Sequence, residues 1–139
     1  MSRTSPSPSI LLISSLAALA PAPTRALYGG TKSASLMLYQ SLAIEHPDIT
    51  FTCVIPSTIE GDFRKSAVDS GPVRESSPNK HGLKRDWVAQ RCIDAVDAQE
   101  RTVFMANFYR IVPMLIYTLG SWGRGIVERG ARKKYNYHA

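Results

Sequence analysis

The sequence predicts an α/β fold, a doubly wound parallel sheet, from three observations. Short apolar or β-branched runs recur at residues 10–15, 49–56 and 102–106. A helical pattern separates each run from the next, at residues 28–45 and 86–99. The alternation of strand and helix is typical of parallel strands joined by crossover helices, and such crossovers are expected to be right-handed. At 139 residues the chain has the size of one domain.

The first run, ILLISS at residues 10–15, is apolar until its two final hydroxyls. This pattern predicts a strand covered on both faces, preceded by a disordered leader at residues 1–9. The region also fits a secretory signal peptide, with a small-x-small site that ends at Ala20. Ser14 and Ser15 interrupt the apolar run, and cleavage after Ala20 would remove the strand. Secretion is therefore the less favoured alternative.

The helix at residues 28–45 follows a loop that Pro21 and Pro23 keep from being helical. Its small and apolar residues recur every three or four positions, which predicts one packed face. The residues on that face are Ala34, Met37, Leu38, Ser41, Leu42 and Glu45. Residues 46–48, His-Pro-Asp, end the helix before the second strand.

Residues 57–84 are polar and rich in Gly, Pro and Ser, which predicts a surface loop with a short amphipathic piece at 62–70. The helix at residues 86–99 follows, and the strand at 102–106 completes the sheet. The helix is expected to bury Val88, Cys92, Ile93 and Val96.

The charge and the cysteines exclude several classes of function. The net charge is +6, but the last sixteen residues hold five basic residues and one acid, so they account for +4 of it. A basic tail does not indicate a nucleic-acid-binding body, and no nucleic acid is expected as a partner. Cys53 and Cys92 lie in apolar surroundings without metal-ligand spacing to any histidine. They are predicted to be reduced core thiols, and no metal site is expected.

Residues 107–139 are predicted to form a C-terminal amphipathic helix with a basic tail. The apolar run at 111–119 is shorter than the roughly twenty residues that span a bilayer. Aromatic residues with a trailing basic cluster favour peripheral contact with an anionic membrane through residues 108–134. The alternative is a helix that packs on the body or lines a substrate entrance. These aromatic residues are Phe108, Tyr109, Tyr117 and Trp122.

The segment ALYGGTK places Tyr28 four residues before Lys32, so both side chains share one face of a helix. A neighbouring ammonium stabilises the phenolate of a tyrosine and so makes it usable in acid–base catalysis. The hydroxyl of Ser15, at the end of the adjacent strand, would hold a substrate oxygen near the phenol. These groups suit the interconversion of a carbonyl and its alcohol. Tyr and Lys at this spacing are also common on amphipathic helices that have no catalytic role.

The segments LLISSLAALAPAPTRALYGGTKSASLMLYQSLAIE and ITFTCVIPSTIEGDF closely resemble the catalytic half of the short-chain dehydrogenase/reductase family. In that family a serine lies thirteen residues before the tyrosine, and this spacing selects Ser15 over Ser14. The resemblance implies that Ser15 orients the substrate oxygen and Tyr28 transfers the proton. It implies that Lys32 assists the tyrosine and binds the nicotinamide ribose. The fold implied is part of a Rossmann-type sheet that binds NAD(P)(H), with NADP slightly preferred.

The turn after the second strand, PSTIEG, matches the family only in part. Pro56 and Ile59 stand where the family contacts the nicotinamide, whereas Ser57 replaces a glycine and Gly61 replaces a threonine. The loop that follows corresponds to the family's variable substrate-binding region. A small hydrophobic alcohol or carbonyl is expected as substrate, by similarity to members that act on lipids. The helix of Tyr28 forms the dimer contact in the family, so a homodimer is expected there.

The Gly-rich turn that binds the pyrophosphate, and the strand carrying the family's relay asparagine, do not occur in this sequence. The expectation is therefore a truncated catalytic half, marginally stable and with little activity alone. The main hypothesis is an NAD(P)(H)-dependent oxidoreductase; the alternative is a non-catalytic remnant that binds a partner or a membrane surface. The expected location is the endoplasmic reticulum surface or the cytoplasm.

Overall fold

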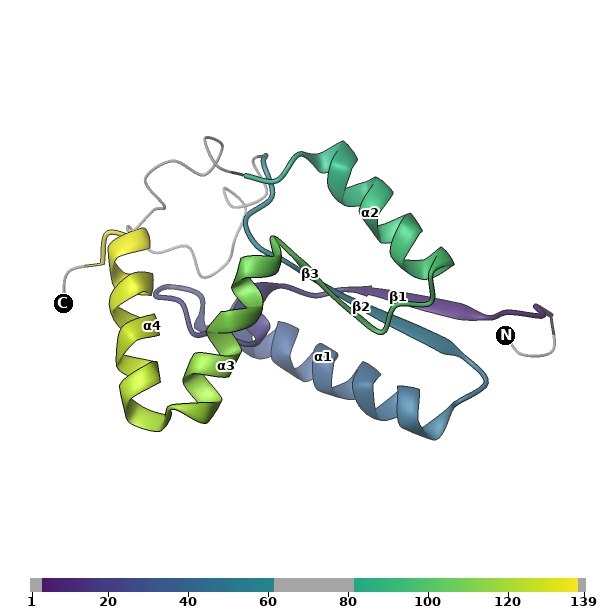
Figure 1. The fold of residues 1–139 in the computed structure, drawn as a ribbon, viewed down its shortest axis with the longest axis horizontal. Helices are drawn as coiled ribbons and strands as arrows, with labels where there is room; N and C mark the ends of the chain where they lie inside the picture. Colours follow the sequence, from purple (N-terminus) through teal and green to yellow (C-terminus); the bar gives the residue numbers. More distant parts are fainter. Residues whose placement is uncertain (1–3, 62–81, 138–139) are drawn as a thin grey trace.

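The structure, a computed structural model, describes residues 4–61 and 82–137 (Figure 1). The amphipathic piece predicted at 62–70 lies outside these residues. The elements follow in the order β1 (Ser9–Ile13), η1 (Leu16–Ala18), α1 (Ala26–Glu45), β2 (Thr50–Pro56), α2 (Arg85–Asp97), β3 (Thr102–Met105), η3 (Asn107–Arg110), α3 (Ile111–Thr118) and α4 (Gly120–Lys134). The three strands and the two helices between them confirm the α/β class that the sequence predicts.

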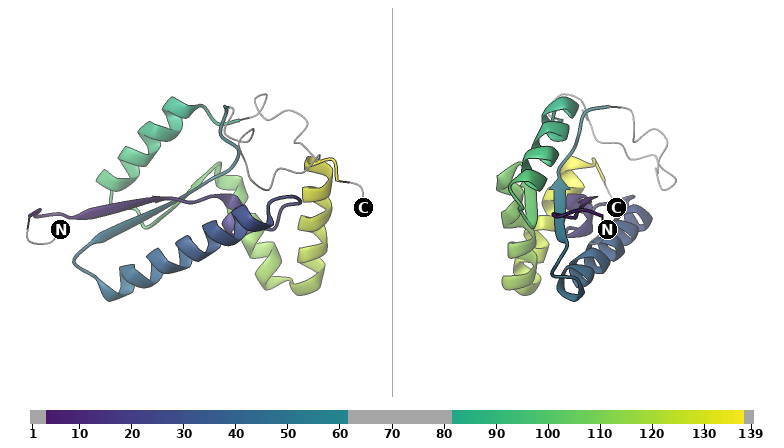
Figure 2. Two further views of the ribbon diagram at one scale, coloured as in Figure 1. Left: turned by 180° about the vertical axis from the view of Figure 1, so that it is seen from behind. Right: turned by 90° about the vertical axis from the view of Figure 1, so that its right-hand side faces the viewer.

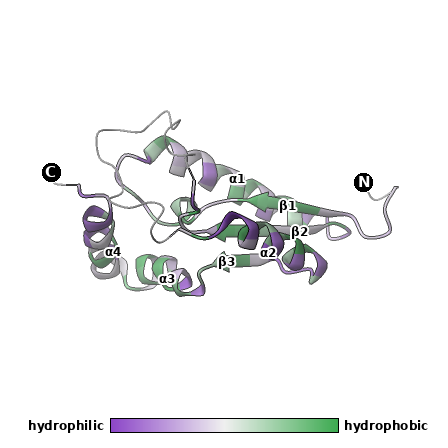
Figure 3. Ribbon diagram, turned by 90° about the horizontal axis from the view of Figure 1, so that it is seen from above, coloured by the Kyte–Doolittle hydropathy of each residue, from purple (hydrophilic) through white to green (hydrophobic). Residues whose placement is uncertain are grey.

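The described strands form one parallel sheet in the order β1-β2-β3. Central strand β2 is buried from Phe51 to Pro56, because it has a neighbour on each edge and a helix on each face. This full burial explains its near-continuous apolar sequence. In Figure 3, β1 and β2 are drawn largely in the hydrophobic colour.

The two crossover helices cover opposite faces of the sheet. Successive strand residues point to opposite faces, and Val54 packs with α2 whereas Cys53 and Ile55 pack with Leu36 of α1. Figure 2 shows the sheet between the two helices. Because both connections step the same way across the sheet, they have opposite hands. The connection through α1 is right-handed and that through α2 is left-handed, so the expectation of right-handed crossovers was wrong for the second.

The prediction for the packed face of α1 was wrong. Met37 and Leu38 are 65% and 56% exposed, whereas Leu36 is 3% exposed and packs on the sheet. Apolar residues occur all round this helix, so spacing alone did not determine which stripe meets the sheet. The hydroxyl of Ser33 also faces inward, because it donates to the carbonyl of Ala18 at 2.6 Å. The inner stripe thus contacts η1 and β2.

Helix α2 buries Val88, Cys92 and Ala95, whereas Ile93, which was predicted to be buried, is 55% exposed. The two cysteines lie in separate core clusters on opposite sides of the sheet, and both are free. Burial raises the pKa of both thiols. These observations confirm that Cys53 and Cys92 are buried thiols of the core.

Strand β1 keeps one apolar face in contact with solvent. Leu11 and Ile13 are 36% and 50% exposed, and they alternate with Leu12, which packs on the α1 side. The core cluster on the other side joins α2 to β2 and β3 and contains no residue of β1. The α2 face of β1 is therefore an apolar surface with little covering from the described residues.

The C-terminal region forms two helices rather than the single helix that the sequence predicts. Gly120, with a φ of 54°, occupies the turn between α3 and α4, a conformation that favours glycine. The helices lie side by side at the carboxyl ends of the strands (Figure 1). They approach closely at Gly123, where an added Cβ would lie 1.9 Å from the carbonyl oxygen of Leu115. None of the described helices is long and apolar enough to cross a membrane.

One buried hydroxyl of the core predicts a stabilising substitution. Thr52 is fully buried, and its Oγ1 has no hydrogen-bond partner among the described residues. Replacing Thr52 by Val is expected to raise the free energy of unfolding by about 1 kcal/mol, since the buried oxygen is removed and the shape is kept. Urea unfolding checks this, with exposed Thr102→Val as the control, expected to change stability by less than about 0.5 kcal/mol. Destabilisation of Thr52→Val beyond its control would contradict the prediction.

Candidate active site

Ser15 lies just beyond the carboxyl end of β1. Its backbone is extended, and its Oγ accepts a hydrogen bond from the amide of Ala17 at 3.2 Å, so it caps η1. The amide of the preceding residue, Ser14, donates to the carbonyl of Val54 at 2.8 Å, which fixes this segment to β2. Serine is suited to this place because its oxygen satisfies an amide at the start of a helical turn. The candidate hydroxyl is thereby held at the edge of the sheet.

Lys32 connects α1 to the same strand end. Its Nζ donates to the carbonyl oxygen of Ile13 at 2.9 Å and lies 5.9 Å from the centre of the Tyr28 ring. Tyr28 is in the first turn of α1, and Lys32 is one turn further on. Gly29 lets this end of the helix approach η1, because a Cβ there would lie only 3.0 Å from the carbonyl oxygen of Ala17. The tyrosine and lysine predicted from the sequence are therefore neighbours beside the end of β1.

Pro56 and Ile59 lie where β2 ends. Pro56 is the last residue of the strand, opposite Met105 of β3. Ile59 pairs with Leu83 in an isolated parallel bridge, so the two ends of the long connection at residues 57–84 lie side by side. Hydrogen bonds of 3.0 Å and 2.9 Å join the same two chain segments. This pairing positions the turn after β2 next to the start of α2.

One cavity contains all five sequence-predicted residues. Its volume is about 810 Å³. Ser15, Tyr28, Lys32, Pro56 and Ile59 all line it. They come from three separate segments, which meet because parallel strands place their carboxyl ends along one edge. The structure thus brings together every residue that the sequence selected for the site.

The α3–α4 hairpin supplies much of the apolar wall of this cavity. The wall residues from the hairpin include Ile111, Val112, Leu115, Ile126 and Val127. The hairpin therefore packs on the body beside the cavity. An apolar wall with a few polar groups at one end is typical of sites for small molecules.

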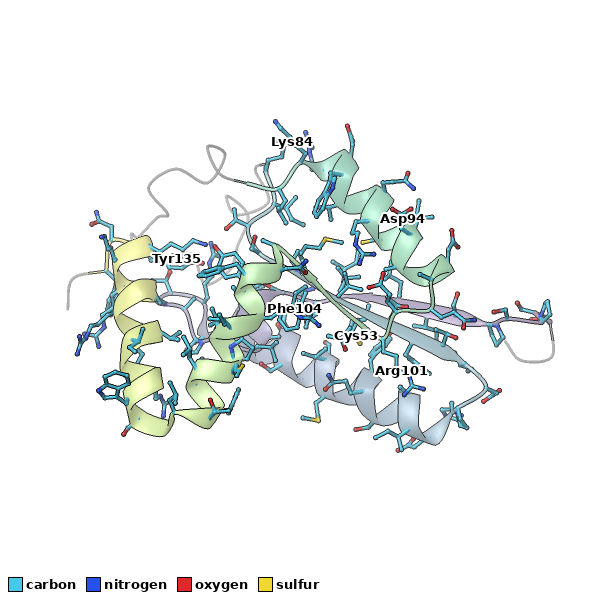
Figure 4. All side chains as sticks on the ribbon, in the orientation of Figure 1. Cys53, Lys84, Asp94, Arg101, Phe104 and Tyr135 are labelled. Carbon is cyan, nitrogen blue, oxygen red and sulfur yellow. The ribbon has the colours of Figure 1, made fainter. Side chains whose placement is uncertain are left out.

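The sequence did not identify several charged residues of the lining, namely Arg25, Glu60, Arg85 and Lys134. Lys134 donates to Thr58 Oγ1 at 3.3 Å, and its Nζ lies 6.0 Å from the centres of the Tyr109 and Tyr135 rings. Figure 4 shows Tyr135 at the end of α4. Lys134 and Thr58 are 76 residues apart. No local pattern in the sequence could have indicated this contact.

Ser14 also lines the cavity, although the thirteen-residue spacing before the tyrosine selected Ser15 in its place. It is 3% exposed, and its Oγ has no hydrogen-bond partner among the described residues. A buried hydroxyl without a partner costs free energy unless a water or a ligand satisfies it. A polar ligand atom in the cavity would satisfy that requirement.

Glu60 at the cavity lining predicts a pH dependence. Its carboxylate accepts from Lys84 Nζ at 2.9 Å and from the Arg85 amide at 3.3 Å. Figure 4 places Lys84 at the start of α2. The Lys84 hydrogen bond, followed by that of the Arg85 amide, lowers the pKa of Glu60 from its ordinary 4.5.

Because this pKa is lower in the folded state, the stability that Glu60 contributes is complete above its ordinary value. That contribution is lost as the pH falls through the lowered value. The difference in melting temperature between the wild type and Glu60→Gln is expected to shrink between about pH 7 and about pH 3. Melting curves across this range check it, and a constant difference would contradict the prediction.

The described residues fit one end of a nicotinamide cofactor. The unpartnered Ser14 hydroxyl, Lys32 and the turn at Pro56 offer polar and backbone groups around one part of the cavity. Across residues 4–61 and 82–137, none of the three strands leads into a Gly-rich turn of the kind that holds a pyrophosphate. Within the same ranges, no group of three His, Cys, Asp or Glu side chains is arranged to hold a metal ion.

Comparison with known proteins gives two matches to oxidoreductases. The chain is 33% identical over 100 residues to "Tropinone reductase-like 3" of Erythroxylum coca, a match that covers 71% of this chain and 36% of that protein. It is 32% identical over 89 residues to human "Dehydrogenase/reductase SDR family member 2, mitochondrial", covering 63% of this chain and 32% of that protein. The matched region is about a third of the length of each relative. No protein-family model matches the chain.

The fold is an α/β arrangement with a three-stranded parallel sheet, and polar groups of the candidate site lie at the strand ends. The two matches support membership in the short-chain dehydrogenase/reductase family.

Proposed function

We propose that this cavity is the site of an NAD(P)(H)-dependent interconversion of an alcohol and a carbonyl on a small hydrophobic substrate. The observation that carries the proposal is the single cavity that joins Ser15, Tyr28 and Lys32 to the apolar wall of α3 and α4. The groups that would act on a substrate oxygen lie at one part of the lining, and the hairpin offers apolar contact to the rest of the molecule.

Each polar residue has a role that its position supports. In the reducing direction, the Ser15 hydroxyl donates to the carbonyl oxygen and orients it, and Tyr28 Oη gives that oxygen a proton. Lys32, anchored on the Ile13 carbonyl, stabilises the resulting phenolate. The cofactor, when bound, supplies the hydride to the carbonyl carbon. In the oxidising direction each transfer is reversed.

The cofactor contacts proposed are Lys32 with the nicotinamide ribose and the backbone at Pro56 and Ile59 with the nicotinamide. NADP is the slightly preferred cofactor. The contact at Ile59 has a structural basis in its pairing with Leu83, which holds the turn after β2 in place. The unpartnered Ser14 hydroxyl lies next to Ser15 and offers one more hydrogen bond there.

Dinucleotide binding is the experiment that tests the proposal. NADPH fluorescence titrations of the native assembly are expected to show binding that Lys32→Met weakens by at least about tenfold, a loss of roughly 1.4 kcal/mol. Lys133→Met is the matched control, since it removes the same charge from an exposed site outside the cavity lining. Equal losses in the two variants, or no binding of NADPH or NADH by the native assembly, would refute the proposal.

The exposed side of α1 favours a second proposal, a partner surface. Leu27, Met37, Leu38 and Ile44 are 66%, 65%, 56% and 83% exposed. Exposed apolar stripes of this kind mark protein contacts. We propose that two copies of the chain form a homodimer through this helix. If the protein is instead a non-catalytic remnant, the same surface would bind a different protein partner. Light scattering of the wild type and of Ile44→Lys distinguishes a dimer from a monomer.

A further inference from the structure

The described lining of the cavity is strongly basic. It contains one acid, Glu60, and four basic residues, namely Arg25, Lys32, Arg85 and Lys134. The carboxylate of Glu60 is itself held by a further cation, because it accepts from Lys84 Nζ at 2.9 Å. A cleft lined mainly by positive charges raises the local concentration of anions. The lining therefore favours a ligand that carries negative charge.

Lys134 marks one place in this wall where such a charge would lie. It is the last residue of α4, and its Nζ donates to Thr58 Oγ1 at 3.3 Å. The same Nζ lies 6.0 Å from the ring centres of Tyr109 and Tyr135. All three partners line the cavity, so the ammonium is part of the cavity wall. These partners are uncharged, so they orient the ammonium but do not themselves neutralise it.

The wall beside Lys134 is apolar. Val127, Ala131 and Lys134 recur at helical spacing on α4, and all three line the cavity. The lining face of this helix is therefore apolar until it ends in a cation. Helix α3 adds further apolar side chains to the same wall, among them Val112 and Leu115. A ligand with an apolar chain and one anionic end matches this surface.

We propose that the substrate of this site is a hydrophobic acid whose carboxylate binds Lys134. Its apolar chain lies against α3 and α4, and its carbonyl or alcohol reaches Ser15 and Tyr28. This inference rests on the proposed function and adds the substrate class to it. An ammonium has three donor hydrogens, so Lys134 can bind a carboxylate oxygen while it keeps its hydrogen bond to Thr58. A phosphate of the cofactor would bring similar charge, and the test has to distinguish these two sources.

Binding of octanoate and octanamide tests the charge without any reaction, since the two compounds differ mainly in the charge at one end. Isothermal titration of the native assembly is expected to give octanoate the higher affinity. Lys134→Met is expected to weaken octanoate binding at least about tenfold and to leave octanamide binding unchanged, which also shows that the cavity is still folded. Lys134→Arg keeps the charge and is expected to keep the preference for octanoate. Lys133→Met, outside the cavity lining, is the control and is expected to match the wild type.

Three results would overturn the inference. The first is equal affinity of the wild type for octanoate and octanamide. The second is an equal loss of octanoate binding in Lys134→Met and Lys133→Met. The third is displacement of octanoate by saturating NADPH, which would assign Lys134 to a cofactor phosphate; octanoate is expected to stay bound.

Turnover separates this inference from the proposed function. Suberate semialdehyde and octanal present an aldehyde on chains of the same length, and only the first carries a carboxylate. Lys134→Met is expected to lower kcat/KM for suberate semialdehyde at least about tenfold and to keep that for octanal. If Lys134→Met reduces both aldehydes as the wild type does, the substrate class is refuted and the reaction stands. If octanoate binds as expected but neither aldehyde is reduced, the proposed function is refuted and the anion site stands.

Discussion

Replacing Tyr28 by Phe is expected to lower the rate of carbonyl reduction at least about 100-fold in the native assembly, within the range that general acid catalysis contributes. The substitution removes only the phenol oxygen. The ring remains beside Lys32, 5.9 Å from its Nζ, and the Ile13 carbonyl still anchors that lysine. NADPH oxidation with a panel of hydrophobic ketones and aldehydes measures the rate.

Tyr39→Phe is the matched control for this prediction. Tyr39 is on the same helix, where it packs edge-on against Phe51 with ring centres 6.2 Å apart, and it does not line the cavity. The control is expected to keep the wild-type rate. If Tyr28→Phe and the wild type reduce the same substrate equally fast, Tyr28 is not the proton donor. NADPH binding that persists in Tyr28→Phe would show that the loss concerns proton transfer rather than folding.

Replacing Gly123 by Ala is expected to separate α3 from α4. The added Cβ would lie 1.9 Å from the Leu115 carbonyl oxygen and 2.7 Å from its carbon, and both are backbone atoms. No side-chain rotation relieves such an overlap, so one helix must move. A loss of about 3 kcal/mol in unfolding free energy is expected, at the upper end for overpacked sites. Because both helices line the cavity, substrate binding should weaken as well.

Gly125→Ala provides the control for the hairpin prediction. It is two residues further along the same helix, and an added Cβ there meets no atom within 4 Å. Alanine favours the helix over glycine by about 1 kcal/mol, so this variant is expected to be slightly more stable than the wild type. Urea unfolding of the two variants measures the difference. Similar effects of both substitutions would show that close packing at Gly123 does not hold the hairpin together.

The α/β class and the strands followed from the sequence because they depend on local pattern. The run at residues 49–56 is almost wholly apolar, and the structure buries it as the central strand β2. The site followed partly from spacing, since residues four apart on a helix share a face and strand ends share an edge. These rules predict from the sequence alone that Tyr28, Lys32 and Ser15 lie close together. They did not place Lys134, whose contact with Thr58 links segments 76 residues apart.

Tertiary packing decided the features that local patterns left open. The side of α1 that packs on the sheet is the one that carries Leu36. Apolar residues occur all round this helix, so the sequence alone does not show which side is buried. Packing also decided the hand of the second crossover, because Val88, Cys92 and Ala95 of α2 are buried against the sheet face opposite to that of α1. Gly120 divides the predicted C-terminal helix into α3 and α4, and the close approach at Gly123 packs these two helices together as part of the cavity wall. The sequence thus determined most of the helices and strands and the residue types at the strand ends. Long-range packing determined which side of each helix is buried and the shape of the cavity, because both depend on contacts between segments that are distant in the sequence.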